Sequence, residues 1–145
     1  MPDVKTDALM AMREAVVLFH EVVTPICRKH GVTVQQMLVL AELEERPHQM
    51  ATQLADRVGI LRTNFAAVCY RMEAKGLISR EQSKVDRRRV HLDTTKKGLD
   101  LLECVTEEFG RVLDQNVSDL SKSDYVAVRD GMSALTKLMS ATTKA

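Results

Sequence analysis

The fold is decided by one stretch of the chain, residues 70–98, which reads YRMEAKGLISREQSKVDRRRVHLDTTKKG. Its first residues continue a helix, and Gly76 ends that helix because glycine adopts the left-handed C-terminal cap without a Cβ penalty. Residues 77–79 and 90–92 then predict two antiparallel strands. A helix followed by an arginine-tipped hairpin suits a DNA duplex, because a helix fits the major groove and a cationic hairpin reaches the adjacent backbone or minor groove. The tip of the connecting loop carries Lys84, Val85, Asp86, Arg87 and Arg88.

The residues just before this stretch predict two helices joined by a tight turn. Met50–Val58 forms a short helix, Gly59 provides the turn, and the next helix runs from about Leu61 to Lys75. Two helices joined by a glycine-containing turn are typical of a helix-turn-helix, whose second helix enters the major groove. The buried side of that second helix is predicted to carry Phe65, Val68, Cys69 and Met72. Its exposed side offers Arg62, Thr63, Asn64, Ala66, Ala67, Tyr70 and Arg71.

Two further helices are predicted upstream. In the first, apolar residues recur at alternating intervals of three and four, which is the stripe of a long helix that pairs with another. Pro25 is expected to kink or end this helix, and Gly31 marks a stop. The second helix begins at Thr33, which forms a capping box with Gln36. The stripe consists of Leu9, Met12, Val16, Phe19, Val23 and Ile26, and the buried side of the second helix is predicted to be Met37, Leu38, Leu40, Ala41 and Leu43.

The C-terminal third of the chain repeats the apolar stripe. Thr95 can cap one helix, and Ser121 or Ser123 can start a last helix in which Tyr125 begins the three-four alternation. The stripes at the two ends most simply bury each other across a two-fold axis, with packing inside one chain as the alternative. We therefore expect a mostly α fold with a small β-hairpin wing (α+β). Its parts are an N-terminal dimerisation helix (1–32), a winged helix-turn-helix lobe (33–98) and C-terminal dimerisation helices (99–145).

Composition limits the class of protein. The chain has 145 residues, 45% of them hydrophobic but only 3% aromatic, so its core must be aliphatic. The net charge is +1, yet Arg71–Lys97 holds nine Lys or Arg against four Asp or Glu, which is the local excess expected of a DNA footprint. Three widely spaced cysteines argue against a disulfide framework or a structural zinc site. No apolar run is long enough to span a membrane, and a cytoplasmic setting is expected.

Residues 70–98 resemble the signature of the MarR family of winged helix-turn-helix regulators, and the resemblance extends less evenly over residues 9–139. Relatives usually begin the recognition helix with a Ser or Thr cap, where this chain has Leu61, and often have Leu where Thr94 stands. Ala66 and Ala67 replace a frequent Thr and Arg; alanines cannot hydrogen-bond to bases but can pack against a thymine methyl. The resemblance rests on the order and spacing of Glu73, Gly76, Leu77, Ile78, Arg80, Asp86, Arg87, Arg88 and Gly98.

The resemblance implies a homodimeric, sequence-specific transcriptional regulator, most simply a repressor, that a small effector releases from a pseudo-palindromic DNA operator. Half-sites on the order of ten base pairs apart would each receive one recognition helix. Asp86 is expected to hold an arginine in position through a charge-assisted hydrogen bond. The predicted DNA contacts are Arg62, Thr63, Asn64, Tyr70, Arg71, Arg80, Lys84, Asp86, Arg87, Arg88 and Arg89.

The resemblance also places an effector between the dimer helices and the DNA-binding lobe. Methionines leave adaptable apolar space there, and Arg13 and His20 could anchor an anionic aromatic ligand. The residues predicted to line this site are Met12, Arg13, Val16, Phe19, His20, Met37 and Leu40.

Alternatives remain open at this level. Cys27 lies beside Arg28, Lys29 and His30, a cationic setting that could favour the thiolate of a redox sensor of the same fold. The fold could also be a protein-interaction module without DNA binding, an alternative that Ala66 and Ala67 keep alive. The four histidines show no metal-ligand spacing, so neither a metal site nor a cofactor is expected. No nucleophile elbow, phosphate loop or paired-acid motif suggests an enzyme.

Overall fold

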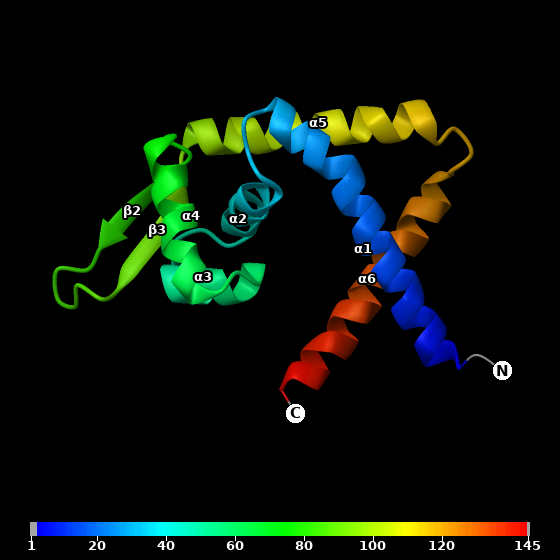
Figure 1. The fold of residues 1–145 in the computed structure, drawn as a ribbon, viewed down its shortest axis with the longest axis horizontal. Helices are drawn as coiled ribbons and strands as arrows, with labels where there is room; N and C mark the ends of the chain where they lie inside the picture. The colour runs from blue at the N-terminus through cyan, green and yellow to red at the C-terminus, as the bar shows by residue number, and fades with distance from the viewer. Residues whose placement is uncertain (1–2, 145) are drawn as a thin grey trace. The chain divides into compact units, whose positions relative to one another are not determined.

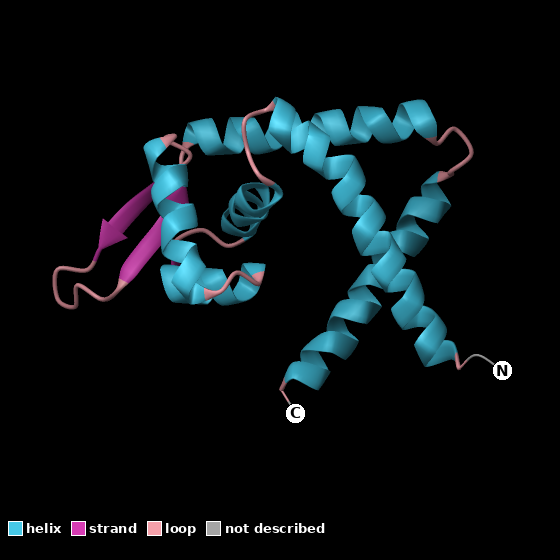
Figure 2. Ribbon diagram, viewed as in Figure 1, coloured by secondary structure: helices cyan, strands magenta, loops and turns pink. Residues whose placement is uncertain are grey.

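The computed structural model describes residues 3–144, which form six helices and one three-stranded antiparallel sheet (Figure 1). The chain divides into two compact units, a first unit up to Gly110 and a second unit from Arg111 onward. Figure 2 shows the hairpin that projects beside the helices, so the predicted mostly α fold with a β-hairpin wing is confirmed. The elements are α1 (Val4–Lys29), α2 (Val34–Glu45), β1 (Gln49–Met50), α3 (Ala51–Val58), α4 (Arg62–Ala74), β2 (Ile78–Gln82), β3 (Val90–Thr94), α5 (Lys96–Asn116) and α6 (Lys122–Thr143).

Helix α1 extends beyond both ends of the apolar stripe seen in the sequence. The Asp3 side chain caps it by accepting a hydrogen bond from the backbone N–H of Lys5, and the helix passes through Pro25 to Lys29. Pro25 does not end the helix, because the buried side chains around it anchor the last turns to the lobe. Within the described part of the chain, the buried residues of α1 are Val23, Ile26 and Cys27.

Helix α2 begins with the predicted capping box. The Thr33 hydroxyl accepts from the Gln36 N–H at 3.1 Å, and the Gln36 side chain accepts from the Thr33 N–H at 3.2 Å. The predicted buried face was partly wrong. Leu38 and Ala41 are exposed, whereas Gln36 and Val39 are buried together with Leu40 and Leu43. A 3.6-residue period places residues 36, 39, 40 and 43 on one face, and that face meets the core.

The helix-turn-helix follows the sequence prediction closely. Gly59 has a φ of 70°, so it provides the left-handed turn after α3. Leu54 and Ala55 face inward from α3, while Val58 is only half-buried. The buried residues of α4 are those predicted, Phe65, Val68, Cys69 and Met72.

The sheet has the order β1-β3-β2 and is antiparallel throughout. The hairpin pairs Ile78 with Thr94 at its base and Gln82 with Val90 near its tip. Strand β1 was not predicted, since two residues carry no periodic pattern; it pairs Gln49 with Leu92.

Helix α5 lies directly against the start of the hairpin. The Thr95 hydroxyl accepts from the Gly98 N–H at 3.1 Å and donates to the Gly76 carbonyl at 2.6 Å. A Cβ on Gly98 would lie 2.2 Å from the Leu77 carbonyl oxygen, so only glycine permits this approach. The wing is therefore tied at its base to the helix that leads into the second unit.

The second unit consists of the end of α5 and all of α6. Ser121, rather than Ser123, caps α6 in a capping box with Asp124. No residue of α6 is buried within residues 3–144, and its apolar stripe, including Val128 and Met132, is exposed. None of the helices described is both long and apolar enough to cross a membrane.

Candidate nucleic-acid interface

Helix α4 presents a polar face opposite its buried face. All seven predicted surface residues of this helix, from Arg62 to Arg71, are exposed, and Tyr70 is 72% exposed. The hydrophobic face packs against α3 and β2. The helix is therefore held from behind, and its outer surface is available to a partner.

Arg62 and Arg80, both predicted to contact DNA, form ion pairs between neighbouring elements. The Arg62 guanidinium binds both oxygens of Asp56, at 3.1 and 2.6 Å, and this hydrogen bonding lowers the pKa of the Asp56 carboxyl. Arg80 on β2 lies 3.5 Å from Glu73 on α4. These pairs connect α3 to α4 and α4 to the wing, respectively.

The tip of the wing is a hydrogen-bonded turn. The Ser83 hydroxyl accepts from the N–H groups of Val85 and Asp86, and the Arg89 N–H donates to the Asp86 carbonyl at 2.9 Å. One Asp86 carboxylate oxygen accepts from both the backbone N–H and the Nε of Arg88, at 3.1 and 3.2 Å. The predicted role of Asp86 in holding an arginine thus matches the geometry found.

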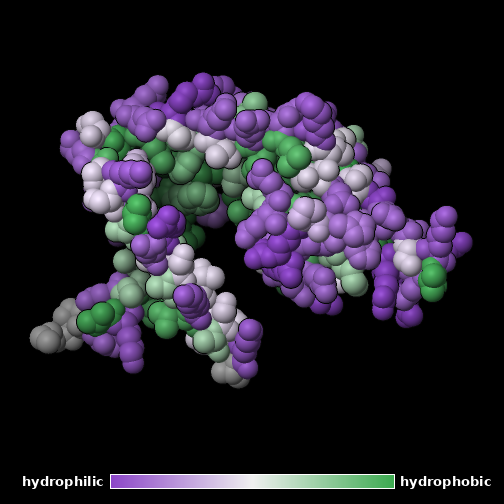
Figure 3. All heavy atoms as spheres, turned by 180° about the vertical axis from the view of Figure 1, so that it is seen from behind, coloured by the Kyte–Doolittle hydropathy of each residue, from purple (hydrophilic) through white to green (hydrophobic). Residues whose placement is uncertain are grey.

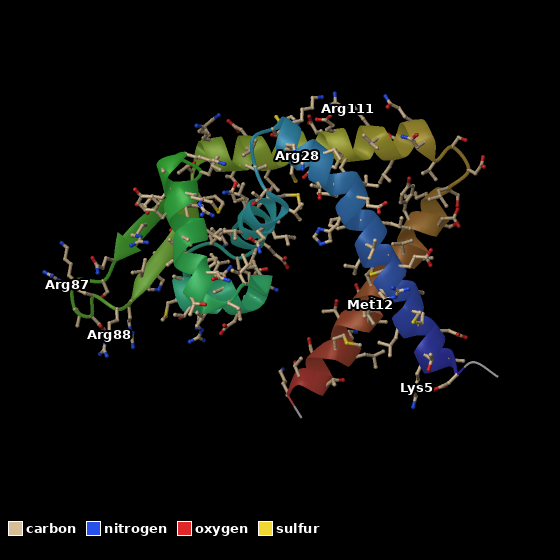
Figure 4. All side chains as sticks on the ribbon, in the orientation of Figure 1. Lys5, Met12, Arg28, Arg87, Arg88 and Arg111 are labelled. Carbon is tan, nitrogen blue, oxygen red and sulfur yellow. The ribbon has the colours of Figure 1, made fainter. Side chains whose placement is uncertain are left out.

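The arginines at this tip extend from the lobe. Arg88 keeps 92% of its side chain exposed despite its bond to Asp86, and Figure 4 shows Arg87 and Arg88 projecting from the hairpin. In Figure 3, seen from behind, the wing is hydrophilic apart from a small hydrophobic spot at its tip, where Val85 is 99% exposed. The wing is thus a cationic projection next to the exposed face of α4.

A cavity of about 140 Å³ lies between the helix-turn-helix and the wing. Phe65, Cys69 and Leu92 contribute to its apolar lining, and Arg62 and Arg80 also border it. Burial raises the pKa of the Cys69 thiol to about 11, so this cysteine is a thiol at neutral pH.

A second cavity, of about 80 Å³, lies between α1, α2 and α5 in the first unit. Two of the seven residues predicted to line an effector site, Phe19 and Met37, border it. Leu40 instead belongs to the core at 1% exposure. Met12, Arg13 and Val16 lie earlier on α1, and His20 follows Phe19 without bordering the cavity. The sequence prediction missed the remaining lining residues, Val23, Ile26, Val105, Thr106 and Phe109, because those on α5 are far along the chain.

Two histidines that are far apart in the sequence meet on the outer face of the sheet. The rings of His48 and His91 stack with centroids 4.5 Å apart. His48 adopts a left-handed φ of 54°, and both its backbone N–H and its ring bind the Asp93 carboxylate. That hydrogen bond raises the pKa of His48. Within residues 3–144, no group of three or more ligand-type side chains is arranged for a metal ion.

The two buried cysteines lack the features of a redox-sensing thiol. Cys27 is 1% exposed and burial raises the pKa of its thiol, which opposes the effect expected from its cationic neighbours in the sequence. A redox-sensing thiol needs a lowered pKa and exposure. Cys104 is exposed, but the described residues provide no second cysteine beside it.

Known proteins of similar sequence agree with this architecture. The sequence model of the MarR family matches residues 30–89, which contain the helix-turn-helix and most of the wing. The chain is also 35% identical over 98 residues to the homoprotocatechuate degradative operon repressor of Escherichia coli. The chain belongs to the MarR family. That match covers 68% of this chain and 64% of the length of the repressor.

Other similar proteins match over more of their length. The regulator FarR of Neisseria gonorrhoeae is 29% identical over 79% of this chain and 78% of its own. The solved structure of NadR in complex with 4-hydroxyphenylacetate superposes with a TM-score of 0.70 at 27% identity, covering 94% of this chain and 99% of that one. The likeness to a solved structure therefore extends over nearly the whole chain, beyond the winged helix-turn-helix lobe.

Proposed function

We propose that this MarR-family chain is a homodimeric, sequence-specific DNA-binding repressor that a small aromatic acid releases from a pseudo-palindromic operator. The observation that carries the proposal is the wing tip. Hydrogen bonds within the protein already form its turn before DNA binds, and its arginines project beside an exposed face of α4. A preformed contact loses less conformational freedom on binding than a mobile loop does.

Each exposed surface fits a different part of a DNA duplex. Helix α4 has the shape for the major groove, where side chains can reach base edges. Arg87 and Arg88 can enter a narrow minor groove, whose negative potential attracts arginine. Lys84 and Arg89 lie on the same hairpin and would bind phosphates, which adds affinity without sequence information.

Two copies are proposed because much of the apolar surface of α1 and α6 is exposed in the described part of the chain. On α1, Leu9 and Val16 are about half exposed, and on α6, Val128 and Met132 are too. Exposed apolar surface of this extent marks an interaction site. A two-fold dimer would present two α4 helices to DNA half-sites that are related by the same symmetry.

The effector class is supported by the relatives and by the cavity beside α1. One relative is named a homoprotocatechuate degradative operon repressor, and another was solved with 4-hydroxyphenylacetate. In the cavity, the rings of Phe19 and Phe109 lie edge to face at 6.1 Å, which suits a third aromatic ring. Neither Arg13 nor His20 borders this cavity, but the two lie about two helical turns apart on one side of α1, and we propose that one of them binds the carboxylate.

The DNA-binding part of the proposal is tested at the wing. Arg88→Ala should weaken binding to operator and scrambled duplexes alike. It should also reduce the dependence of log Kd on log salt concentration by about one unit, as expected for one lost phosphate-like contact. Asp86→Ala should have a smaller effect in the same direction, because Asp86 acts by positioning Arg88.

Arg28→Ala is the matched control for the loss of one positive charge. Arg28 lies near the end of α1, far from the wing within the first unit (Figure 4), and is exposed. The control should bind DNA like the wild type. If Arg88→Ala also binds both duplexes like the wild type at every salt concentration, the wing is not a DNA contact and the protein-interaction alternative replaces the proposal.

The effector part is tested with 4-hydroxyphenylacetate as the probe and 4-ethylphenol, which lacks the carboxylate, as the control ligand. The acid should release operator DNA at concentrations at which the phenol does not. Arg13→Ala or His20→Ala should raise the concentration needed without altering DNA affinity in the absence of ligand. Equal release by acid and phenol would refute a carboxylate anchor.

A further inference from the structure

Leu61, the residue that precedes α4, is unfavourable for folding in two respects. It occupies the N-cap position, but its side chain cannot accept a hydrogen bond from the free N–H groups of the first turn, and no cap bond is made. It is also 71% exposed, so its side chain gains little from burial. A residue that satisfies neither the helix nor the core is a candidate for a role in binding.

The local backbone fixes the direction of this side chain. Ile60 is buried at 7% exposure, and its N–H donates to the Ala55 carbonyl at 3.0 Å. Leu61 follows with φ −56° and ψ 135°, close to the polyproline II conformation, whose three residues per turn point consecutive side chains in different directions. The Leu61 carbonyl accepts from the N–H groups of Asn64 and Phe65, each at 2.9 Å. Leu61 is therefore held firmly and points outward at the start of α4.

The guanidinium of Arg62, the next residue in the chain, is engaged by another partner. Arg62 is held by both carboxylate oxygens of Asp56, so its guanidinium lies toward α3. The first turn of α4 consequently offers an apolar group at Leu61, followed by the short polar side chains of Thr63 and Asn64. This arrangement does not suit a phosphate as the partner of Leu61.

The major groove of DNA presents one apolar group, the 5-methyl group of thymine. In a helix-turn-helix, the N-terminal residues of the second helix are those that meet base edges. We propose that Leu61 packs against a thymine methyl in each half-site and is a specificity-determining residue of the repressor. This inference rests on the proposed function, since it requires α4 to enter the major groove.

The experiment uses the full-length protein and an operator selected by that protein from random duplexes. Each thymine of the half-site is replaced in turn by deoxyuridine, which removes only the methyl group. At one position, the wild type should lose about fourfold in affinity per half-site, the factor that corresponds to ~0.8 kcal/mol for one methyl-sized group. Leu61→Ala and Leu61→Ser should bind the thymine and deoxyuridine operators equally.

Two control variants distinguish a contact between Leu61 and thymine from misfolding and from the loss of any exposed apolar side chain. Leu61→Ser introduces a good N-cap, so its thermal unfolding midpoint should equal or exceed that of the wild type and exclude misfolding. Val85→Ser removes another exposed apolar side chain, from the wing tip, and should retain the full deoxyuridine effect.

Three results would overturn the inference. One is a wild type that is insensitive to every deoxyuridine replacement. Another is a sensitivity that persists in both Leu61 variants, because a different residue, such as Ala67, would then read the methyl group. Failure to bind any duplex at all would refute the proposed function as well, which distinguishes that failure from the first two.

Discussion

Replacing Gly98 with alanine tests how the wing is joined to α5. In most helices the change from glycine to alanine is favourable, because alanine restricts the unfolded chain and has the highest helix propensity. At Gly98, the added Cβ would lie 2.2 Å from the Leu77 carbonyl oxygen and 3.0 Å from the Leu40 side chain. The closest atom belongs to the backbone, so a rotamer change cannot relieve the contact.

The expected change in the free energy of unfolding of Gly98→Ala is the difference between two opposing contributions. Helix propensity stabilises the alanine variant by about 1 kcal/mol, whereas forcing extra volume into a packed site costs about 1–3 kcal/mol, and the upper end applies to a backbone contact this short. The Leu77 carbonyl also accepts the Thr95 N–H at 3.0 Å, a bond that a shift of α5 would stretch. We expect Gly98→Ala to be less stable than the wild type by about 2 kcal/mol.

Gly110→Ala provides the matched control in the same helix. A Cβ built on Gly110 would meet nothing within 4 Å outside the neighbouring backbone of its own helix, so this variant should be more stable than the wild type by about 1 kcal/mol. Urea unfolding followed by circular dichroism gives both values, at one protein concentration because dimerisation contributes to stability. A Gly98→Ala protein as stable as Gly110→Ala would refute the close approach of α5 to the strand.

Three other predictions concern pH, thiols and assembly. Hydrogen bonding from Lys29 lowers the pKa of Glu108, so this carboxylate stabilises the fold above its ordinary pKa of 4.5 and loses that effect as the pH falls through its lower folded value. Thermal unfolding of Glu108→Gln should therefore show a deficit at neutral pH that closes in acid; a deficit independent of pH would contradict it. Iodoacetamide at pH 8 should alkylate Cys104 first, as mass spectrometry would detect. Cys27→Ser should leave DNA binding and its release by ligand unchanged. If peroxide releases the wild type from DNA but not this variant, redox sensing is favoured instead. Deleting the chain after Ser123 should yield aggregates or an unfolded protein in size-exclusion chromatography, and a monodisperse folded monomer would exclude an obligate dimer.

Features that depend on a few neighbouring residues were predictable from the sequence. The capping box of Thr33 and Gln36, the left-handed turns at Gly59 and Gly76, and the buried face of α4 were all predicted and found. Each depends on a hydrogen bond or a periodicity within about one or two turns of chain, so no tertiary information is required.

Other features depended on segments that approach only after folding. Strand β1 forms because β3, more than forty residues later, supplies its partner. The sequence marked Gly98 as part of a family pattern, but only its distance to Leu77 explains why a side chain is excluded there. Similarly, the sequence predicted Arg62 as a DNA contact, and the folded chain pairs it with Asp56.

The candidate sites divide in the same way. The arginines of the wing and the exposed face of α4 follow from local turns and helix periodicity, so the sequence by itself determined which surfaces are proposed to bind DNA. The cavity beside α1 depends on Val105 and Phe109 of α5, and the His48–His91 stack depends on pairing in the sheet. Contacts between distant segments are set by how whole elements pack, which periodicity within any one element does not encode, and these only the tertiary structure decided.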